Sequence, residues 1–225
     1  MRANEFLMEV PLPSDWDPAV YSQPTSFKKR LEYALERAAR LGTGSSRVAF
    51  VIPFEGRDTV LKVAKNAKGI AQNKEEYNIL SDGYVQSMGI TIPFIDAGQD
   101  TAHNTTWVQT EKAEKLTMGK LRQFFGVADP FRLLITYAFS ITSTGPNWLR
   151  RNPQELIQAA QQEGVSDDQL ENIEDYGYSL GVLSSDYNVE LLDFAQKANW
   201  GVFQGKPVVI DVGFTTEVKS LYFPR

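Results

Sequence analysis

Two polar residues flank a short apolar segment late in the chain and could act together as metal ligands. Asn199 precedes the run WGVF, and Asp211 follows the β-branched run VVI, with the turn residues QGKP between the runs. That pattern predicts a β-hairpin, which brings its outer ends side by side. An amide oxygen and a carboxylate on one rigid ribbon suit magnesium, which prefers oxygen ligands and is often held partly by a substrate's phosphates. The alternative is a buried hairpin whose polar ends hold no ligand.

A lysine interrupts another apolar strand much earlier in the chain. In the segment TVLKVA, alternation along a strand places Lys62 on the same face as its aliphatic neighbours two positions away. Because burying an unpaired charge is unfavourable, Lys62 needs a carboxylate or an anionic ligand. The helix expected over 70–81 offers Glu76 as that partner, or Glu75 if the register of the helix differs by one.

A glycine-containing loop stands just before this lysine strand. The sequence GTGSSR covers residues 42–47, and it leads into a predicted hairpin of strands 47–54 and 59–64. Gly42 and Gly44 carry no side chain, so backbone amides in this loop can approach phosphate oxygens closely. The alternative is an ordinary turn at the end of a helix.

The pattern along the whole chain predicts an α+β protein. Apolar residues three and four apart mark helices, and short alternating or β-branched runs mark strands. Residues 1–25, with four prolines, are expected to form an extended arm on the surface. The expected helices are 27–40, capped by Ser26 and ended by Gly42, 70–81, 117–125, 129–140, 153–162 and 166–183, and the expected strands are 47–54, 59–64, 90–97, 105–110, 200–203 and 208–210.

Composition limits the function. The 225 residues are 42% hydrophobic and 23% charged, which is typical of a globular protein with a sizeable core. The net charge of −5 argues against a broad nucleic-acid surface, and the absence of cysteine excludes disulfides, thiolate nucleophiles and cysteine metal sites. No apolar run is long enough to span a membrane, and the first ten residues carry acids where a signal peptide would be basic. The one histidine, His103, is expected in a surface loop.

The order of these parts resembles the protein-kinase-like superfamily: a glycine loop, a lysine in VLKV, a helix glutamate, an Asn-ended strand and an Asp-x-Gly. The resemblance implies a bilobal α+β fold, with an antiparallel-sheet N-lobe that carries one helix and a reduced, mostly helical C-lobe. It also implies ATP and Mg²⁺ as cofactors. The implied roles are Gly42, Gly44, Ser45 and Arg47 near the phosphates, Lys62 paired with Glu76, Glu111 and Ala113 at the adenine hinge, and Asn199 and Asp211 on the metal.

The implied domains are an arm over 1–25, an N-lobe over 26–112 and a C-lobe with the metal-binding hairpin over 113–225. The strings GSSRV, VLKVAKN, EEYNIL and NWG are also similar to uncharacterised kinase-like proteins of tailed bacteriophages. That likeness implies the host cytoplasm or the virion as the location.

The sequence departs from the family pattern at three places. Arg47 replaces the third glycine of the loop, where its side chain could contact phosphate or obstruct the cleft. The family's catalytic aspartate stands five residues before the Asn, but here that residue is Phe194 and Asp193 stands six before. A bulge in the loop could still aim Asp193 at a substrate hydroxyl. The chain ends twelve residues after Gly213, so no activation segment of the protein-kinase type is expected.

These features predict an ATP- and magnesium-binding, kinase-like protein, and as its activity a phosphotransferase with an unknown acceptor. The alternative is a degenerate pseudokinase scaffold in contact with a protein partner, for instance a phage structural component. A third hypothesis is a small-molecule kinase that resembles the aminoglycoside and choline phosphotransferases. The expected partner is a nucleotide, with a protein as a further candidate and neither nucleic acid nor a membrane.

Overall fold

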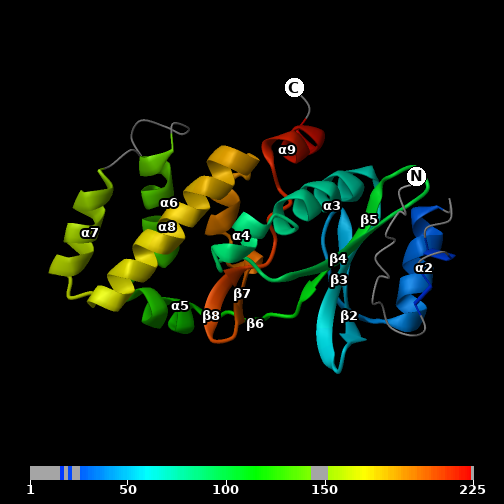
Figure 1. Ribbon diagram of the computed structural model, residues 1–225, viewed down its shortest axis with the longest axis horizontal. Helices are drawn as coiled ribbons and strands as arrows, with labels where there is room; N and C mark the ends of the chain where they lie inside the picture. The colour runs from blue at the N-terminus through cyan, green and yellow to red at the C-terminus, as the bar shows by residue number, and fades with distance from the viewer. Residues whose placement is uncertain (1–15, 18–19, 22–25, 143–151, 224–225) are drawn as a thin grey trace, which may run out of the picture.

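A computed structural model describes residues 16–17, 20–21, 26–142 and 152–223 of the chain. An antiparallel sheet and its helices form one end of the molecule, and a helical part forms the other (Figure 1). The predicted α+β class, with a sheet-containing first part and a mostly helical second part, is therefore confirmed. Most of the predicted arm over 1–25, and most of the predicted loop over 142–152, lie outside the described residues.

The first sheet has five strands, and its centre is the predicted hairpin. Arg47 pairs with Ala64 and Ala49 pairs with Lys62. The glycine loop, which ends at Arg47, therefore lies next to the end of the strand that carries Lys62. Glu55 and Gly56 form the tight turn with φ of 47° and 77°. The strand order is β1 (Ala39–Thr43), β2 (Arg47–Phe54), β3 (Arg57–Ala64), β5 (Thr105–Glu111) and β4 (Phe94–Gln99).

Two of the predicted boundaries that differ from the structure lie at the first sheet. The first helix, α2 (Phe27–Arg37), begins at its predicted cap Ser26 but ends three residues early, because the chain continues as β1 on the edge of the sheet. Gly42 is therefore a strand residue, and it does not end a helix. The predicted strand 90–97 begins only at β4, since the preceding residues make an isolated bridge from Thr91 to Val209 instead.

Part of the N-terminal segment is buried. Trp16 and Tyr21 pack against each other with ring centroids 4.9 Å apart, and both belong to the apolar cluster beneath the sheet. These two residues therefore belong to the core, where a surface arm was predicted.

The helix α3 (Ala67–Leu80) connects the sheet to the rest of the molecule. Asn66 caps its start. Gly69 allows close approach to the sheet, because a Cβ there would collide with the carbonyl oxygen of Ser46. Ile79 and Leu80, at its other end, belong to the second apolar cluster of the helical part. The short helix α4 (Gly83–Ser87) follows.

The helical part packs around the long helix α8, which extends four residues beyond its predicted end. Gly177 and Gly181 lie inside this helix, where α6 packs so closely that a Cβ would come within 2.5 Å of Tyr137 and 2.6 Å of Ile141. The glycines thus serve helix packing. The helices are α5 (Met118–Phe125), α6 (Pro130–Ile141), α7 (Pro153–Gln162) and α8 (Asp167–Tyr187).

The predicted late hairpin forms, and a short strand completes a second sheet of order β6 (Glu114–Lys115), β7 (Trp200–Phe203) and β8 (Lys206–Val209). Two 3₁₀ turns, η2 (Leu191–Ala195) and η3 (Lys197–Asn199), lead into it. After the hairpin, the helix α9 (Thr216–Tyr222) packs beside α3 (Figure 1).

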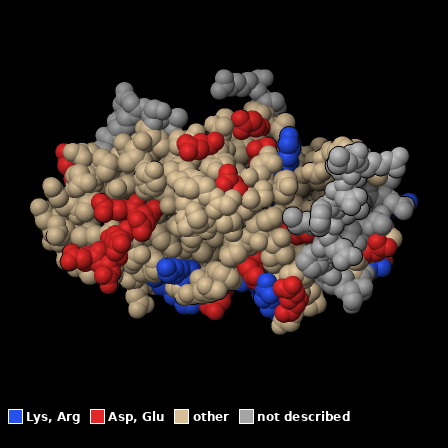
Figure 2. Space-filling model, in the orientation of Figure 1, with Lys and Arg blue, Asp and Glu red and all other residues tan. Residues whose placement is uncertain are grey.

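The surface is acidic where α7 and α8 lie (Figure 2). Asp167 and Asp168 are exposed in the first turn of α8, where acids favour the helix dipole. His103 is exposed in a turn, as predicted. Among the described residues no single helix is long and apolar enough to cross a membrane, although the pair α5 and α6, bent by 53°, meets that length and composition test together.

Candidate functional site

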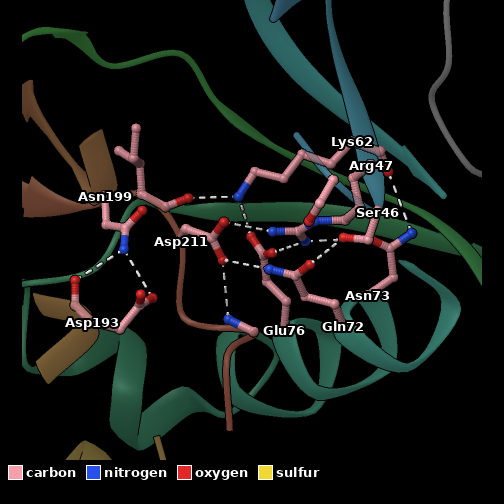
Figure 3. A network of polar contacts seen from close by, with 12 residues as sticks. Ser46, Arg47, Lys62, Gln72, Asn73, Glu76, Asp193, Asn199 and Asp211 are labelled. Atoms are coloured by element: carbon pink, nitrogen blue, oxygen red, sulfur yellow. Dashed lines mark hydrogen bonds and ion pairs between the residues drawn. The ribbon is translucent and has the colours of Figure 1, made fainter. Parts of the chain in front are cut away.

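Glu76 lies at the centre of a network of ion pairs between the sheet and α3 (Figure 3). Its side chain is 0% exposed, and its two carboxylate oxygens accept hydrogen bonds from different cations. Lys62 of β3 binds Oε1, and Arg47 of β2 binds Oε2. Between the two glutamates considered as partners of Lys62, the structure therefore selects Glu76, while Glu75 faces away on the half-buried side of the helix.

Arg47 joins this network to Asp211. Its Nη2 lies 2.7 Å from Asp211 Oδ2, and its Nη1 donates to Glu76 and to Asn73 Oδ1 at 3.2 Å. Burial alone would lower the pKa of Arg47, but Asp211 and Glu76 raise it above its usual value. Burial would likewise raise the pKa of Asp211, but Arg47 and Lys62 hold it below its usual value. Both groups are therefore charged over the ordinary pH range.

Two glycines let the chain build this network at close range. Gly69 brings the start of α3 against Ser46, whose hydroxyl donates to Gln72 Oε1 at 2.7 Å. At Gly213 a Cβ would lie 2.5 Å from the carbonyl oxygen of Gln72. Gly213, two residues after Asp211, has no positive φ, and it serves the close approach of this loop to α3.

Asp193 and Asn199 form the opposite wall. The Asn199 Nδ2 donates to Asp193 Oδ2 at 2.8 Å and to the Asp193 carbonyl oxygen at 3.0 Å. Burial, together with the charges of Asp211 and Glu190, raises the pKa of Asp193 to about 6, against a smaller opposite effect of Arg47. The 3₁₀ turn η2 carries Asp193, and the predicted role of Asp193 toward a substrate hydroxyl stays a prediction.

A cavity of about 530 Å³ lies between these walls. The glycine loop forms one side, and Phe214 and Tyr222 close the cavity from the α9 side. Glu76 lies behind Lys62, in contact with it. The predicted site residues that line the cavity are Gly42, Gly44, Ser45, Arg47, Lys62, Asp193, Asn199 and Asp211.

The two predicted hinge residues are not brought to this cavity. The Glu111 carboxylate binds Arg57 on the sheet, with Nε 2.9 Å from Oε1. Ala113 packs against Gly201, so closely that a Cβ on that glycine would collide with it. In the described part of the chain neither residue is among those that line the cavity.

Polar residues of the site that the sequence did not mark include Ser46, Gln72, Asn73 and Tyr222. Gln72 and Asn73 are buried polar residues on the face of α3 that carries Glu76, which is a signal that a helix-face analysis could use. Tyr222 has no such signal, because the fold alone places α9 there. Its hydroxyl lies 3.4 Å from Ser45 Oγ, and the Lys68 ammonium lies 4.5 Å from its ring centroid.

The arrangement does not fit a magnesium ion held by Asn199 and Asp211. Asp211 Oδ2 accepts from Arg47, and Oδ1 accepts from the Gly213 amide at 3.3 Å and from Gln72 Nε2 at 3.4 Å. Asn199 donates through Nδ2 to Asp193, and no hydrogen bond to its Oδ1 is found among the described residues, so the side of the pair that is already occupied is Asp211. No group of three or more His, Asp or Glu side chains suited to a metal occurs within the described ranges.

No protein-family model matches the chain, and no curated protein is similar to it. Solved structures similar to it include the pseudokinase DRIK1 (drought responsive inactive kinase 1) bound to ENMD-2076, at 11% identity over 81% of this chain and 61% of that chain, with a TM-score of 0.37. Another is a ternary complex of a thermostable mutant of aminoglycoside phosphotransferase APH(4)-Ia with ADP and hygromycin B, at 18% identity over 84% of this chain and 72% of that chain, with a TM-score of 0.34. The chain spans 60–61% of the length of the two pseudokinase structures it matches. Because these likenesses are weak, the proposals below rest on contacts within the chain itself.

Proposed function

We propose that this chain is a kinase-like protein that binds ATP in the cavity under the glycine loop and transfers phosphate to an acceptor still to be identified. The observation that carries the proposal is Lys62, which is paired with the buried Glu76 on the wall of that cavity.

Lys62 is held so that it can present a donor to an anion. Its side chain is 11% exposed, and an ammonium has three N–H groups. Glu76 accepts one, and the carbonyl oxygen of Ile210 accepts another at 2.5 Å. In the described structure this leaves one donor for a ligand in the cavity. A fixed cation beside the open backbone of Gly42 and Gly44 suits a nucleotide phosphate.

Asp193 supports the transfer step of the proposal. With a pKa of about 6, its carboxylate is ionised at neutral pH, so it can accept the proton of an acceptor hydroxyl. The hydrogen bond from Asn199 fixes its orientation toward the cavity. A group positioned in this way contributes to phosphoryl transfer mainly by orienting the nucleophile.

Calorimetric titration with ATP tests the binding proposal, and the matched variants are Lys62→Met and Lys74→Met. Lys74 is an exposed lysine on α3 outside the cavity. We expect wild-type protein and Lys74→Met to bind ATP equally, and Lys62→Met to lose at least about tenfold in affinity, or about 1.4 kcal/mol. ATP at a hundred times its Kd should stabilise the wild-type fold by about 2.7 kcal/mol.

The alternative of a degenerate scaffold predicts a different result. In that case wild-type protein shows neither heat of binding nor a thermal shift at millimolar ATP, and the proposal is overturned. We further propose that the chain is of phage origin, which rests only on the resemblance of the short strings GSSRV, VLKVAKN, EEYNIL and NWG. Detection of the chain in purified virions, against its detection only in the host cytoplasm, would separate a structural component from an enzyme.

A further inference from the structure

Arg47 occupies the carboxylate that the kinase-like pattern reserves for a metal. Its guanidinium lies 2.7 Å from Asp211 Oδ2 and also contacts Glu76, so one cation bridges two carboxylates from different parts of the chain (Figure 3). The Arg47 side chain is only 7% exposed. Asn73 accepts a further hydrogen bond from the same nitrogen that binds Glu76.

A divalent ion at this place would have to displace the guanidinium. Magnesium requires oxygen ligands at about 2.0–2.1 Å in near-octahedral geometry. Asp211 Oδ2 is already bound by Arg47, and Oδ1 faces two further donors, the Gly213 amide and Gln72. Displacing the guanidinium from Asp211 would cost Arg47 one of its two buried ion pairs, since Glu76 would remain its partner.

Arg47 also keeps donors for a ligand. A guanidinium has five N–H groups, and the contacts with Glu76, Asn73 and Asp211 use three of them. The residue lines the cavity together with Lys62. A planar guanidinium matches phosphate oxygens well, and its charge does not depend on pH.

We infer that Arg47 is the resident cation of this site and takes the place of the metal, so that nucleotide phosphates bind to Arg47 and Lys62 without a divalent ion. This inference rests on the proposed function, and it assigns Asp211 a different task from metal ligation. Asp211 holds Arg47 in place, much as Glu76 holds Lys62.

The test measures metal binding and nucleotide binding separately on the full chain. Mn²⁺, which shares the oxygen-ligand preference of magnesium and is visible by electron paramagnetic resonance, serves as the metal probe. We expect wild-type protein to bind no Mn²⁺ at stoichiometric level, and its ATP affinity in excess EDTA to lie within about twofold of that in millimolar Mg²⁺.

Variants at Arg47 sharpen the test. Arg47→Met keeps much of the side-chain volume but removes the charge, so we expect it to bind Mn²⁺ and to bind ATP at least about tenfold more tightly with Mg²⁺ than in EDTA. Arg47→Lys keeps a cation at this position, and we expect its ATP affinity to be independent of Mg²⁺. Circular dichroism checks that each variant folds, and the wild-type measurements still decide the question if Arg47→Met does not.

Three outcomes would overturn the inference, and they are distinguishable. Stoichiometric Mn²⁺ binding by wild-type protein shows that Arg47 does not replace the metal. ATP binding by wild-type protein only in the presence of Mg²⁺ retains the proposed function but removes this inference. ATP binding in neither condition removes the proposed function and, with it, the metal-free mode of binding.

Discussion

Asp211 and Asp193 line the same cavity, but their surroundings move their pKa values in opposite directions. Arg47 and Lys62 lower the pKa of Asp211 although it is buried. Burial and neighbouring acids raise the pKa of Asp193 to about 6, because its close partner is the uncharged amide of Asn199. The difference comes from the elements that face each residue. The strands β2 and β3 supply cations to Asp211, whereas η3 supplies the amide of Asn199 to Asp193.

This contrast divides the tasks of the site. A carboxylate locked to a guanidinium is a structural counterion and cannot exchange protons near neutral pH. A carboxylate with a pKa of about 6, and with no ion pair to a described residue, can accept a proton. Three substitutions test the contrast, and the largest effect is expected where the cations are anchored.

Glu76→Ala should destabilise the side of the cavity that contains Asp211. It removes the carboxylate that both Lys62 and Arg47 bind, and it leaves two buried cations short of a partner. We expect the free energy of unfolding to fall by about 3–5 kcal/mol, as for other broken buried ion pairs. Urea denaturation measures this change.

Glu75→Ala is the matched control, because Glu75 is the adjacent glutamate on the same helix. We expect a much smaller change, of about 1 kcal/mol or less, because Glu75 is half-buried and takes part in none of the ion pairs found among the described residues. An equal loss of unfolding free energy in the two variants would mean that Glu76 does not anchor the cations. The opposite pKa shifts of Asp211 and Asp193 would then need another cause.

Gly213→Ala should displace the Asp211 loop from α3. The added methyl would lie 2.5 Å from the carbonyl oxygen of Gln72, which is backbone and cannot rotate away. We expect a loss of about 1–3 kcal/mol from this overpacking. Gly83→Ala is the control, because a Cβ there meets nothing within 4 Å. Thermal unfolding measures the midpoint of both variants. Equal midpoints would argue against the close approach of the Asp211 loop to α3.

Asp193→Asn should change the stability of the fold least, and the change should depend on pH. The folded chain holds the Asp193 proton up to about pH 6, whereas the unfolded chain releases it near 3.8, so the charged form destabilises the fold increasingly as the pH rises between these values. We expect Asp193→Asn to be more stable than wild-type protein at pH 7–8, by about 1 kcal/mol after allowance for solvent screening.

Near pH 3.5 that advantage should disappear, because both states of wild-type protein then carry the proton. Denaturation at a series of pH values measures the difference. A constant difference across the series would show that the stabilisation does not arise from the charge of Asp193.

The sequence predicted the elements that have strong local signals. The hairpin β2–β3, the helix cap at Ser26 and the late hairpin follow from turn residues and apolar periodicity that act within a few positions. The same reasoning missed β1, because its pairing with β2 is a tertiary contact and its residues have no strand pattern of their own.

For the candidate site, polar residues within or beside apolar strands and helices marked Lys62, Glu76, Asn199 and Asp211, whereas Asp193 was marked only by the resemblance to the kinase-like pattern. The nucleotide, magnesium and catalytic roles of these residues remain predictions. The sequence could not show which way each side chain turns, since Arg47, Glu76 and Asp211 lie on three separate elements.

The sequence by itself determined the order of the elements, the charges available and the glycines that permit close packing. Only the tertiary structure decided that Arg47 meets Asp211, 164 positions further along the chain, while Asn199 turns to Asp193. The physical reason is that partners of a buried charge are chosen by which carboxylates the fold brings within hydrogen-bond distance, and no local pattern encodes that distance.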